Sequence, residues 1–264
     1  MRTTFNAARH ADYLGADPSD RYAKSCRPIE VCGLSLQADG SLSAEFWQWL
    51  WPTPGTPLDV GALLAEINAA RATLVDGPQA IASPGMPMRV AERLCSAPGK
   101  TPDHLPQSGP YSGFIRSSIE LFAACAKAGV PLSPAGLVGG MAETYPGAVW
   151  RRLVPGLPNK TRVAGRAIRK ALLECLGVTN LPLLPSHDQL DACLCVLLAA
   201  AADAQVAGLS VQALGPALSR TVDGTWREGP IAVVELSPAL QAIAAEWLFC
   251  APGGTPRNRA RTQE

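Results

Sequence analysis

Charge is scarce in this sequence of 264 residues. Charged residues make up 17% of it, and the formal net charge is +1. A strongly polycationic binder of nucleic acids or membranes is therefore excluded, and any basic surface must be local. Long apolar runs are also missing: the N-terminus has none of signal-peptide length, and the longest stretch, 192–202, falls short of the ~20 residues that span a bilayer. We therefore expect a cytoplasmic protein without membrane association.

Several motifs of common chemistries are absent as well. The chain has no G-x-S-x-G elbow, no G-x-x-x-x-G-K-[ST] loop and no G-x-G-x-x-G turn, which argues against a serine hydrolase, a P-loop NTPase and a dinucleotide-binding enzyme. The eight cysteines include no C-x-x-C pair, and Cys193 and Cys195 would point to different sides of a helix. We expect reduced thiols, mostly in the core, and no zinc site.

Hydrophobic residues make up 47% of the chain, which is enough for a large globular core. The pattern of apolar residues and turns predicts strands at 13–16, 28–36, 42–51, 72–75, 137–145 and 231–235. It predicts helices at 58–72, 87–95, 114–128, 161–176, 187–206 and 238–249. Three leading antiparallel strands followed by alternating helices and strands indicate an α/β fold, with a mixed sheet and helices on both faces.

This order of elements is that of the RNase H-like fold. We expect a single domain over residues 1–252, with a Pro/Gly-rich insertion at about 78–113 that runs over one face. The Arg-rich residues 253–264 are expected to be a disordered tail.

Acidic residues occur at the ends of two predicted strands and at the start of one helix. Asp17 and Asp76 each end a strand and precede Pro or Gly, at the sheet edge where ligands collect. Asp188 and Asp191 lie on one face of the helix that begins at His187. Carboxylates held close together repel unless divalent cations neutralise them, and Mg²⁺ or Mn²⁺ prefers such oxygen ligands. For Asp188, stabilisation of the helix dipole behind a Ser186 N-cap is an equally good explanation.

Several segments resemble the successive motifs of domain-of-unknown-function family 429, a predicted nuclease family. The His187–Ala192 block is also similar to the acidic helix of RuvC-type Holliday-junction resolvases. The resemblance covers roughly Asp12 to Glu235, and its motifs occur in the family's order. The matching segments are Val75-Asp76-Gly77-Pro78, Glu143-Thr144-Tyr145-Pro146 with Trp150-Arg151, Gly165-Arg166 and His187-Asp188-Gln189-Leu190-Asp191-Ala192.

The resemblance implies roles for individual residues. Asp17 and Asp76 would be metal ligands from neighbouring strands, and Asp188 and Asp191 would complete the site. Glu143 would be an outer ligand or an orienting base, and His187 would assist proton transfer or bind phosphate, although a structural role is equally open for both. A polar segment after Asp17 replaces the expected tight hairpin, so Asp20 is an alternative first ligand.

Basic residues are concentrated between Arg151 and Lys170, a stretch without acidic residues. Their helical spacing predicts either a solvated face or a track for nucleic-acid phosphates beside the acidic site. The predicted nucleic-acid-binding residues are Lys160, Arg162, Arg166, Arg169 and Arg89. Arg89 lies in a loop that suits a lid, and it could instead pair with Glu92 or orient the acidic cluster.

The sequence therefore predicts a nuclease that uses Mg²⁺ or Mn²⁺ and water to hydrolyse phosphodiester bonds in DNA or RNA. Nucleic acid is the expected partner, and a homodimer is left open. The alternative is a catalytically inactive RNase H-like protein that binds nucleic acid or acts as a scaffold. An actin-like kinase is a third hypothesis, but it normally needs two such domains and Gly-rich phosphate loops.

Overall fold

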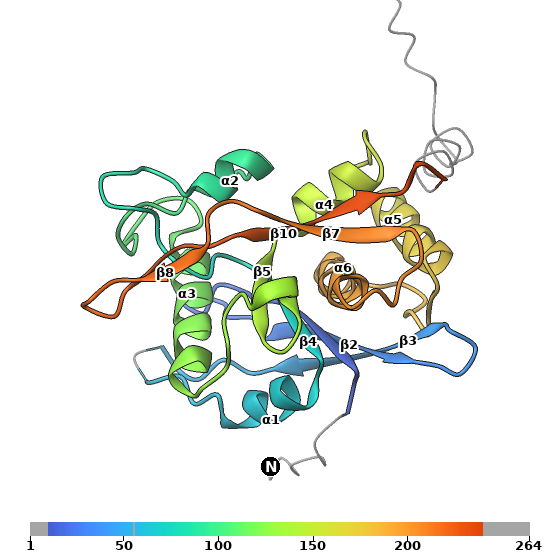
Figure 1. The fold of residues 1–264 in the computed structure, drawn as a ribbon, viewed down its shortest axis with the longest axis horizontal. Helices are drawn as coiled ribbons and strands as arrows, with labels where there is room; N and C mark the ends of the chain where they lie inside the picture. The colour runs from blue at the N-terminus through green and yellow to red at the C-terminus, as the bar shows by residue number, and fades with distance from the viewer. Residues whose placement is uncertain (1–9, 55, 240–264) are drawn as a thin grey trace, which may run out of the picture.

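The computed structural model describes residues 10–54 and 56–239, which form a mixed α/β structure around one large sheet (Figure 1). The strands of that sheet, in spatial order, are β6 (Val178–Thr179), β3 (Leu42–Trp49), β2 (Ile29–Leu36), β1 (Tyr13–Asp17), β4 (Ala72–Asp76), β5 (Met141–Thr144), β10 (Ile231–Leu236) and β7 (Leu209–Leu214). A separate hairpin pairs β8 (Leu218–Arg220) with β9 (Trp226–Glu228). The helices are α1 (Gly61–Ala69), α2 (Val90–Cys95), α3 (Ser112–Lys127), α4 (Pro146–Leu153), α5 (Val163–Cys175) and α6 (His187–Ala202), with a 3-10 turn at Ala135–Leu137.

Strand direction follows the order expected from the sequence. Strands β1, β2 and β3 are antiparallel neighbours, whereas β4 runs parallel to β1 and β5 runs parallel to β4. The parallel pairs are joined through helices, as such crossovers require. The C-terminal ends of β1 and β4 therefore lie side by side, with Ala16 opposite Val75.

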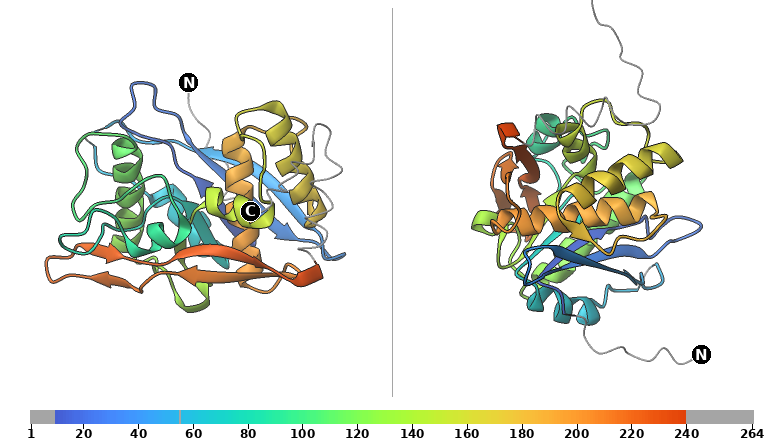
Figure 2. Two further views of the ribbon diagram at one scale, coloured as in Figure 1. Left: turned by 90° about the horizontal axis from the view of Figure 1, so that it is seen from above. Right: turned by 90° about the vertical axis from the view of Figure 1, so that its right-hand side faces the viewer.

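The sheet curls around α6, which lies between the β2–β3 side and the β10–β7 side (Figure 1). Helix α5 lies beside α6 (Figure 2). The opposite face of the sheet is covered by α1 and α3, whose apolar residues pack on Leu14, Val31 and Val75. Because β1 and β4 are buried on both faces, their residues are almost continuously apolar.

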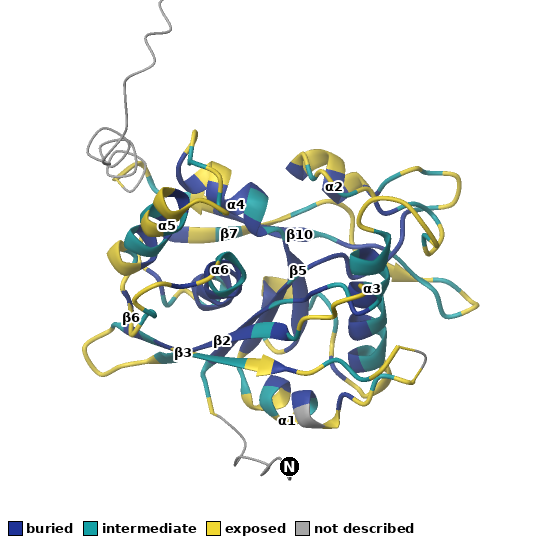
Figure 3. Cartoon of the chain, turned by 180° about the vertical axis from the view of Figure 1, so that it is seen from behind, coloured by how far each residue is buried: buried dark blue, intermediate teal, exposed yellow. Residues whose placement is uncertain are grey.

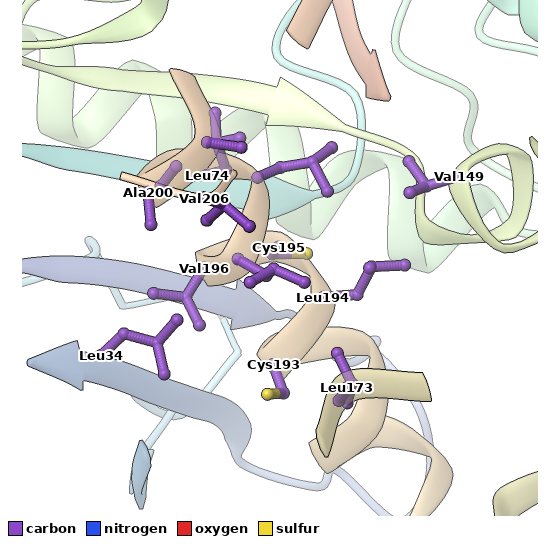
Figure 4. Packing of buried hydrophobic residues seen from close by; sticks show 14 of the residues in the cluster. Leu34, Leu74, Val149, Leu173, Cys193, Leu194, Cys195, Val196, Ala200 and Val206 are labelled. Carbon is purple, nitrogen blue, oxygen red and sulfur yellow. The ribbon is translucent and has the colours of Figure 1, made fainter. Parts of the chain in front are cut away.

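Helix α6 is buried on nearly all sides, which differs from the expected amphipathic helix. Every residue from Leu190 to Ala201 is buried, as the dark blue of α6 in Figure 3 indicates. Successive side chains leave the helix in different directions and all meet apolar neighbours (Figure 4). An Asp at position 191 is therefore carried into the interior rather than along a solvated edge.

The structure also corrects several element boundaries. Helix α6 ends at Ala202 instead of residue 206, because Ala204 has a left-handed φ of 56°. Strand β5 begins only at Met141, since Gly136 and Leu137 adopt positive φ in the preceding turn. Helix α4 and strands β6 to β9 were not predicted from the sequence. Most of the helix predicted at 238–249 and all of the predicted disordered tail at 253–264 lie outside the described residues.

No helix within the described ranges is long and apolar enough to cross a membrane. The seven cysteines in the described part of the chain are free thiols, and five of them are buried, whereas Cys26 and Cys175 are exposed. Three tryptophans that alternate along the end of β3 and just beyond it pack against one core cluster. Trp49 is buried, Trp47 and Trp51 pack against the same core, and the Nε1 atoms of Trp47 and Trp49 donate hydrogen bonds of 2.9 Å to Glu66.

Candidate metal centre

Three of the four predicted ligands meet at the C-terminal edge of the central strands. Asp17 ends β1, Asp76 ends β4, and Asp191 lies in the second turn of α6. One carboxylate oxygen from each lies within 4.8 Å of the others. Asp17 and Asp76 are partly exposed, whereas Asp191 is buried. Three oxygen ligands from three separate elements match the preference of a hard divalent cation, so the donor set fits Mg²⁺ or Mn²⁺.

Gly15 allows Asp191 to approach Asp17. A Cβ at Gly15 would overlap the carbonyl oxygen of Ala192 and the amide nitrogen of Val196, so β1 and α6 are in backbone contact at this point. Any larger residue would push the helix away from the strand. The position of the Asp191 carboxylate therefore depends on Gly15, which lies two residues before Asp17.

Gly15→Ala is expected to lower the free energy of unfolding by about 1–3 kcal/mol, because the added methyl group overpacks the contact between β1 and α6. It should also weaken Mn²⁺ binding, since displacement of α6 separates the ligands. Urea unfolding in EDTA and a Mn²⁺ titration measure the two effects. The matched control is Gly99→Ala, whose Cβ meets nothing within 4 Å. Wild-type stability in Gly15→Ala would show that the helix is not held at this contact.

The three carboxylates repel one another. Burial raises the pKa of Asp17 well above its usual range, and the charge of Asp76 raises it further. Burial, followed by the charge of Asp191, raises the pKa of Asp76 to about 8. Without a cation, the centre therefore favours protonated carboxyl groups.

This repulsion predicts a pH dependence of stability. A carboxyl group whose pKa is higher in the folded than in the unfolded state binds more protons in the folded state, so the protein loses stability as pH rises. For Asp76 the window runs from about 4, the unfolded pKa, to about 8, the folded pKa. In EDTA, the wild-type protein should therefore lose stability relative to Asp76→Asn as pH rises through this window. Denaturant unfolding at several pH values measures the difference. Mn²⁺ should reduce it, and a constant difference across the window would contradict the raised pKa.

Lys160 is already bound to this centre. Its Nζ donates a hydrogen bond to Oδ2 of Asp191, and Trp150 Nε1 donates one of 2.7 Å to Oδ1. Burial alone would lower the pKa of Lys160, but the charge of Asp191 outweighs it and raises the pKa. The lysine side chain is 44% exposed and that of Asp191 1%, so the lysine reaches from solvent into the interior. Lys160 was predicted as a phosphate ligand; in the structure it neutralises the acidic cluster.

Asp188, the fourth predicted ligand, is not part of the group of three. It forms an ion pair with Arg27, and its Oδ1 lies 2.6 Å from Nδ1 of His187. Ser186 caps α6 by accepting a hydrogen bond from the amide of Gln189. Asp188 therefore lies at the rim of the centre with a basic partner. His187 lies beside it, and both line the same cleft.

The alternative first ligand, Asp20, lies apart from the three carboxylates. Its Oδ1 accepts a hydrogen bond of 2.8 Å from the amide of Tyr22, and its carboxylate lies against Gly113 at the start of α3. An acidic side chain there is favourable for the helix dipole. The segment after β1 therefore holds Asp20 against α3 and leaves Asp17 as the residue in the cluster.

Glu143 and Arg89 form a buried ion pair, which bears on the alternatives that the sequence left open for both. Arg89 is 1% exposed and donates hydrogen bonds of 2.5 and 2.6 Å to the two carboxylate oxygens of Glu143. Arg89 also donates hydrogen bonds to Glu92, which was one of the alternatives predicted from the sequence. Arg89 is thus not available to nucleic acid, because its donors are used inside the protein. Glu143 accepts hydrogen bonds from Arg89 and from the amide of Gln79 at 3.0 Å, which favours the structural role that the sequence left open for it.

Arg89→Met is expected to lower the free energy of unfolding by about 3–5 kcal/mol, because it leaves Glu143 and Glu92 buried without their cation. Arg27→Met is the matched control: Arg27 also pairs with a carboxylate, but its side chain is 62% exposed, and the expected cost is about 1 kcal/mol or less. Denaturant unfolding of both variants makes the comparison. Equal costs would mean that the Arg89 network carries no special stability.

The predicted basic track on α5 is interrupted. Arg169 is buried, donates hydrogen bonds to the carbonyl oxygens of Pro158 and Gly165, and lies over the ring of Trp150. Arg162 is exposed at the N-cap, Arg166 donates to the carbonyl of Thr161, and Lys170 pairs with Glu174. The helix is rotated so that Arg169 faces inward with Leu172 and Leu173. Arg169 is therefore a core residue.

A cleft of about 760 Å³ opens above the three carboxylates. Its walls include residues that the sequence analysis did not identify, above all Arg27, Tyr111 and Phe114. A signal was present for Tyr111, which lies in a Gly/Pro-rich segment three residues before the helix predicted at 114–128. Comparison of this chain with protein-family models, with curated proteins and with solved structures finds no match.

Proposed function

We propose that this protein is a metal-dependent nuclease with an RNase H-like fold that hydrolyses phosphodiester bonds in DNA or RNA. The observation that carries the proposal is the convergence of Asp17, Asp76 and Asp191 at the floor of a cleft. Carboxylates whose pKa values rise without a cation are suited to bind one. Mg²⁺ or Mn²⁺ is the proposed cofactor, and nucleic acid is the proposed partner.

The strand order supports the fold assignment. The segment β3-β2-β1-β4-β5, with β2 antiparallel to its neighbours, is the order expected of an RNase H-like sheet. The acidic motifs that resemble domain-of-unknown-function family 429 agree with the same assignment, although no family model matches the chain. In such a sheet the active site lies at the C-terminal ends of the first and fourth strands, where Asp17 and Asp76 are found.

Each side chain of the cleft has a separate proposed role in the reaction. When bound, a divalent ion supplies Lewis-acid activation of water and of the phosphodiester. The three carboxylates hold that charge at the sheet edge, and Gly15 keeps Asp191 within reach. Arg27 provides positive charge for phosphate oxygens, Lys160 would do so on release from Asp191, and His187 is placed at the rim to accept or donate a proton.

A second candidate function is a catalytically inactive protein that binds nucleic acid or acts as a scaffold. The observation in its favour is that both oxygens of Asp191 already have partners, Lys160 and Trp150. An internal ammonium group can neutralise the cluster without any metal. In that case the cleft would bind nucleic acid and release it unchanged.

A cleavage assay distinguishes the two candidates. End-labelled single-stranded DNA, duplex DNA and RNA are incubated with the full chain in Mn²⁺, in Mg²⁺ or in EDTA. Cleavage that requires a divalent ion and disappears in Asp76→Asn supports the nuclease. Binding of nucleic acid without cleavage in any of these conditions supports the scaffold, and neither binding nor cleavage would contradict both.

A further inference from the structure

An exposed tyrosine in an unfavourable backbone conformation lies at the edge of the cleft. Tyr111 has φ 62° and ψ 4°, and 56% of its surface is exposed. A bulky residue rarely adopts this left-handed region, which costs about 1–2 kcal/mol relative to a glycine. Exposed apolar area adds no stability to offset that cost. Such a combination at a cleft is expected where the side chain is needed for binding.

A second ring continues the same wall toward the acidic group. Phe114 lies three residues after Tyr111, at the start of α3. Its ring is next to Gly77, because a Cβ at Gly77 would lie 3.3 Å from the Cζ atom of Phe114. Gly77 directly follows the ligand Asp76. The two rings therefore line a path from solvent to the carboxylates, and both belong to the cleft.

Positive charge also lines this cleft. Arg27 has a side chain that is 62% exposed, and Lys160 reaches Asp191 from solvent. Arg151 is exposed too, with one guanidinium nitrogen bonded to the carbonyl oxygens of Cys95 and Ser96. Aromatic faces bind bases with little sequence preference, and cations follow the phosphate backbone. Rings and cations together are the usual composition of a site for single strands, whereas a duplex presents paired bases whose faces are stacked and inaccessible.

We propose that the cleft binds an unpaired nucleotide of a single-stranded nucleic acid, with its base against Tyr111 and Phe114. This inference rests on the proposed function, since it names the substrate class of the same centre. The adjoining phosphate then lies toward Asp17, Asp76 and Asp191. The buried position of Asp191 agrees with this, because a flexible single strand reaches a recessed floor more easily than a rigid duplex.

Fluorescence anisotropy of a dye-labelled oligothymidylate tests the proposal, with a hairpin duplex of equal nucleotide number as competitor and Ca²⁺ as the divalent ion. The full chain should bind the single strand at least tenfold more tightly than the duplex. Tyr111→Asn removes the ring but tolerates the left-handed backbone, so it should fold with an unchanged or higher melting temperature. Its affinity for the single strand is expected to fall about 5- to 100-fold.

Tyr111→Phe is the matched control, because it keeps the ring, and it should bind like the wild type. Equal affinity for duplex and single strand would overturn the inference, as would wild-type binding by Tyr111→Asn. Mn²⁺ binding, followed by electron paramagnetic resonance, separates these results from failure of the proposed function. A protein that binds Mn²⁺ and cleaves duplex in preference to single strands remains a nuclease, but its substrate class is not the one inferred here.

Discussion

Asp76→Asn is expected to reduce metal-dependent cleavage by at least about a thousandfold. Asp76 is one of the three carboxylates of the acidic group, at the end of β4 and beside β1. An amide at this position removes one negative charge from a set of three, so the divalent ion is bound weakly and out of position. Loss of several kcal/mol of charge stabilisation in the transition state corresponds to this factor. Cleavage rates at saturating Mn²⁺ measure it.

The same substitution should stabilise the metal-free protein at neutral pH. The pKa of Asp76 is raised by burial and by Asp191, so its carboxyl group, which is charged in the unfolded chain, must take up a proton on folding at neutral pH. An amide of similar shape avoids that cost. Asp39→Asn is the control, since Asp39 is exposed in the turn between β2 and β3 and its carboxylate accepts hydrogen bonds from nearby Ser41. If Asp76 is a metal ligand, Asp76→Asn should lose activity and yet have a higher free energy of unfolding in the absence of metal. Activity within tenfold of the wild type would show that the centre is elsewhere.

The parts of this structure that the sequence predicted are those determined by local patterns. Strands β1, β2, β3 and β4 follow alternating or continuous apolar runs that end at turn residues, so their bounds were found within about two residues. Asp17 and Asp76 could be paired because both end strands, and parallel neighbours bring such ends together. Asp188 and Asp191 were added because they share one face of the helix that begins at His187 and because the family resemblance implies both as ligands; of the two, Asp191 joins the group.

The errors concern contacts between segments that are distant in sequence. Lys160 lies in an irregular loop, and nothing local to that loop indicates that its ammonium group binds Asp191, 31 residues further on. Arg89 and Glu143 are separated by 54 residues, so their ion pair was not predictable from spacing. Arg169 was placed by helical spacing on a basic stripe, but it is buried, and Trp150 and two carbonyl groups provide its partners. These contacts decide which charges face the cleft.

Lys160→Met is expected to tighten Mn²⁺ binding by at least about tenfold. The ammonium group of Lys160 bonds to Asp191 and also lowers the pKa of Asp17 and of Asp76, so it competes with a metal ion for the same negative charge. A unit positive charge a few ångströms from a divalent ion is repelled by several kcal/mol at intermediate dielectric. The exposed lysine side chain can turn away and avoid most of this repulsion, so the expected change in affinity is smaller than the full repulsion. Isothermal titration with Mn²⁺ measures the change. Lys170→Met is the control, because Lys170 pairs with Glu174 on α5.

Cleavage by Lys160→Met then decides what the lysine does when a metal is present. If Lys160 moves from Asp191 to a substrate phosphate, the variant should bind Mn²⁺ more tightly and yet bind nucleic acid more weakly, with a smaller dependence on salt. If the lysine only neutralises the cluster, nucleic-acid binding should remain unchanged while metal affinity rises. Unchanged Mn²⁺ affinity would mean that the ammonium group and the ion do not compete. The contact between Lys160 and Asp191 would then no longer favour an inactive scaffold, because it would be compatible with a loaded metal centre.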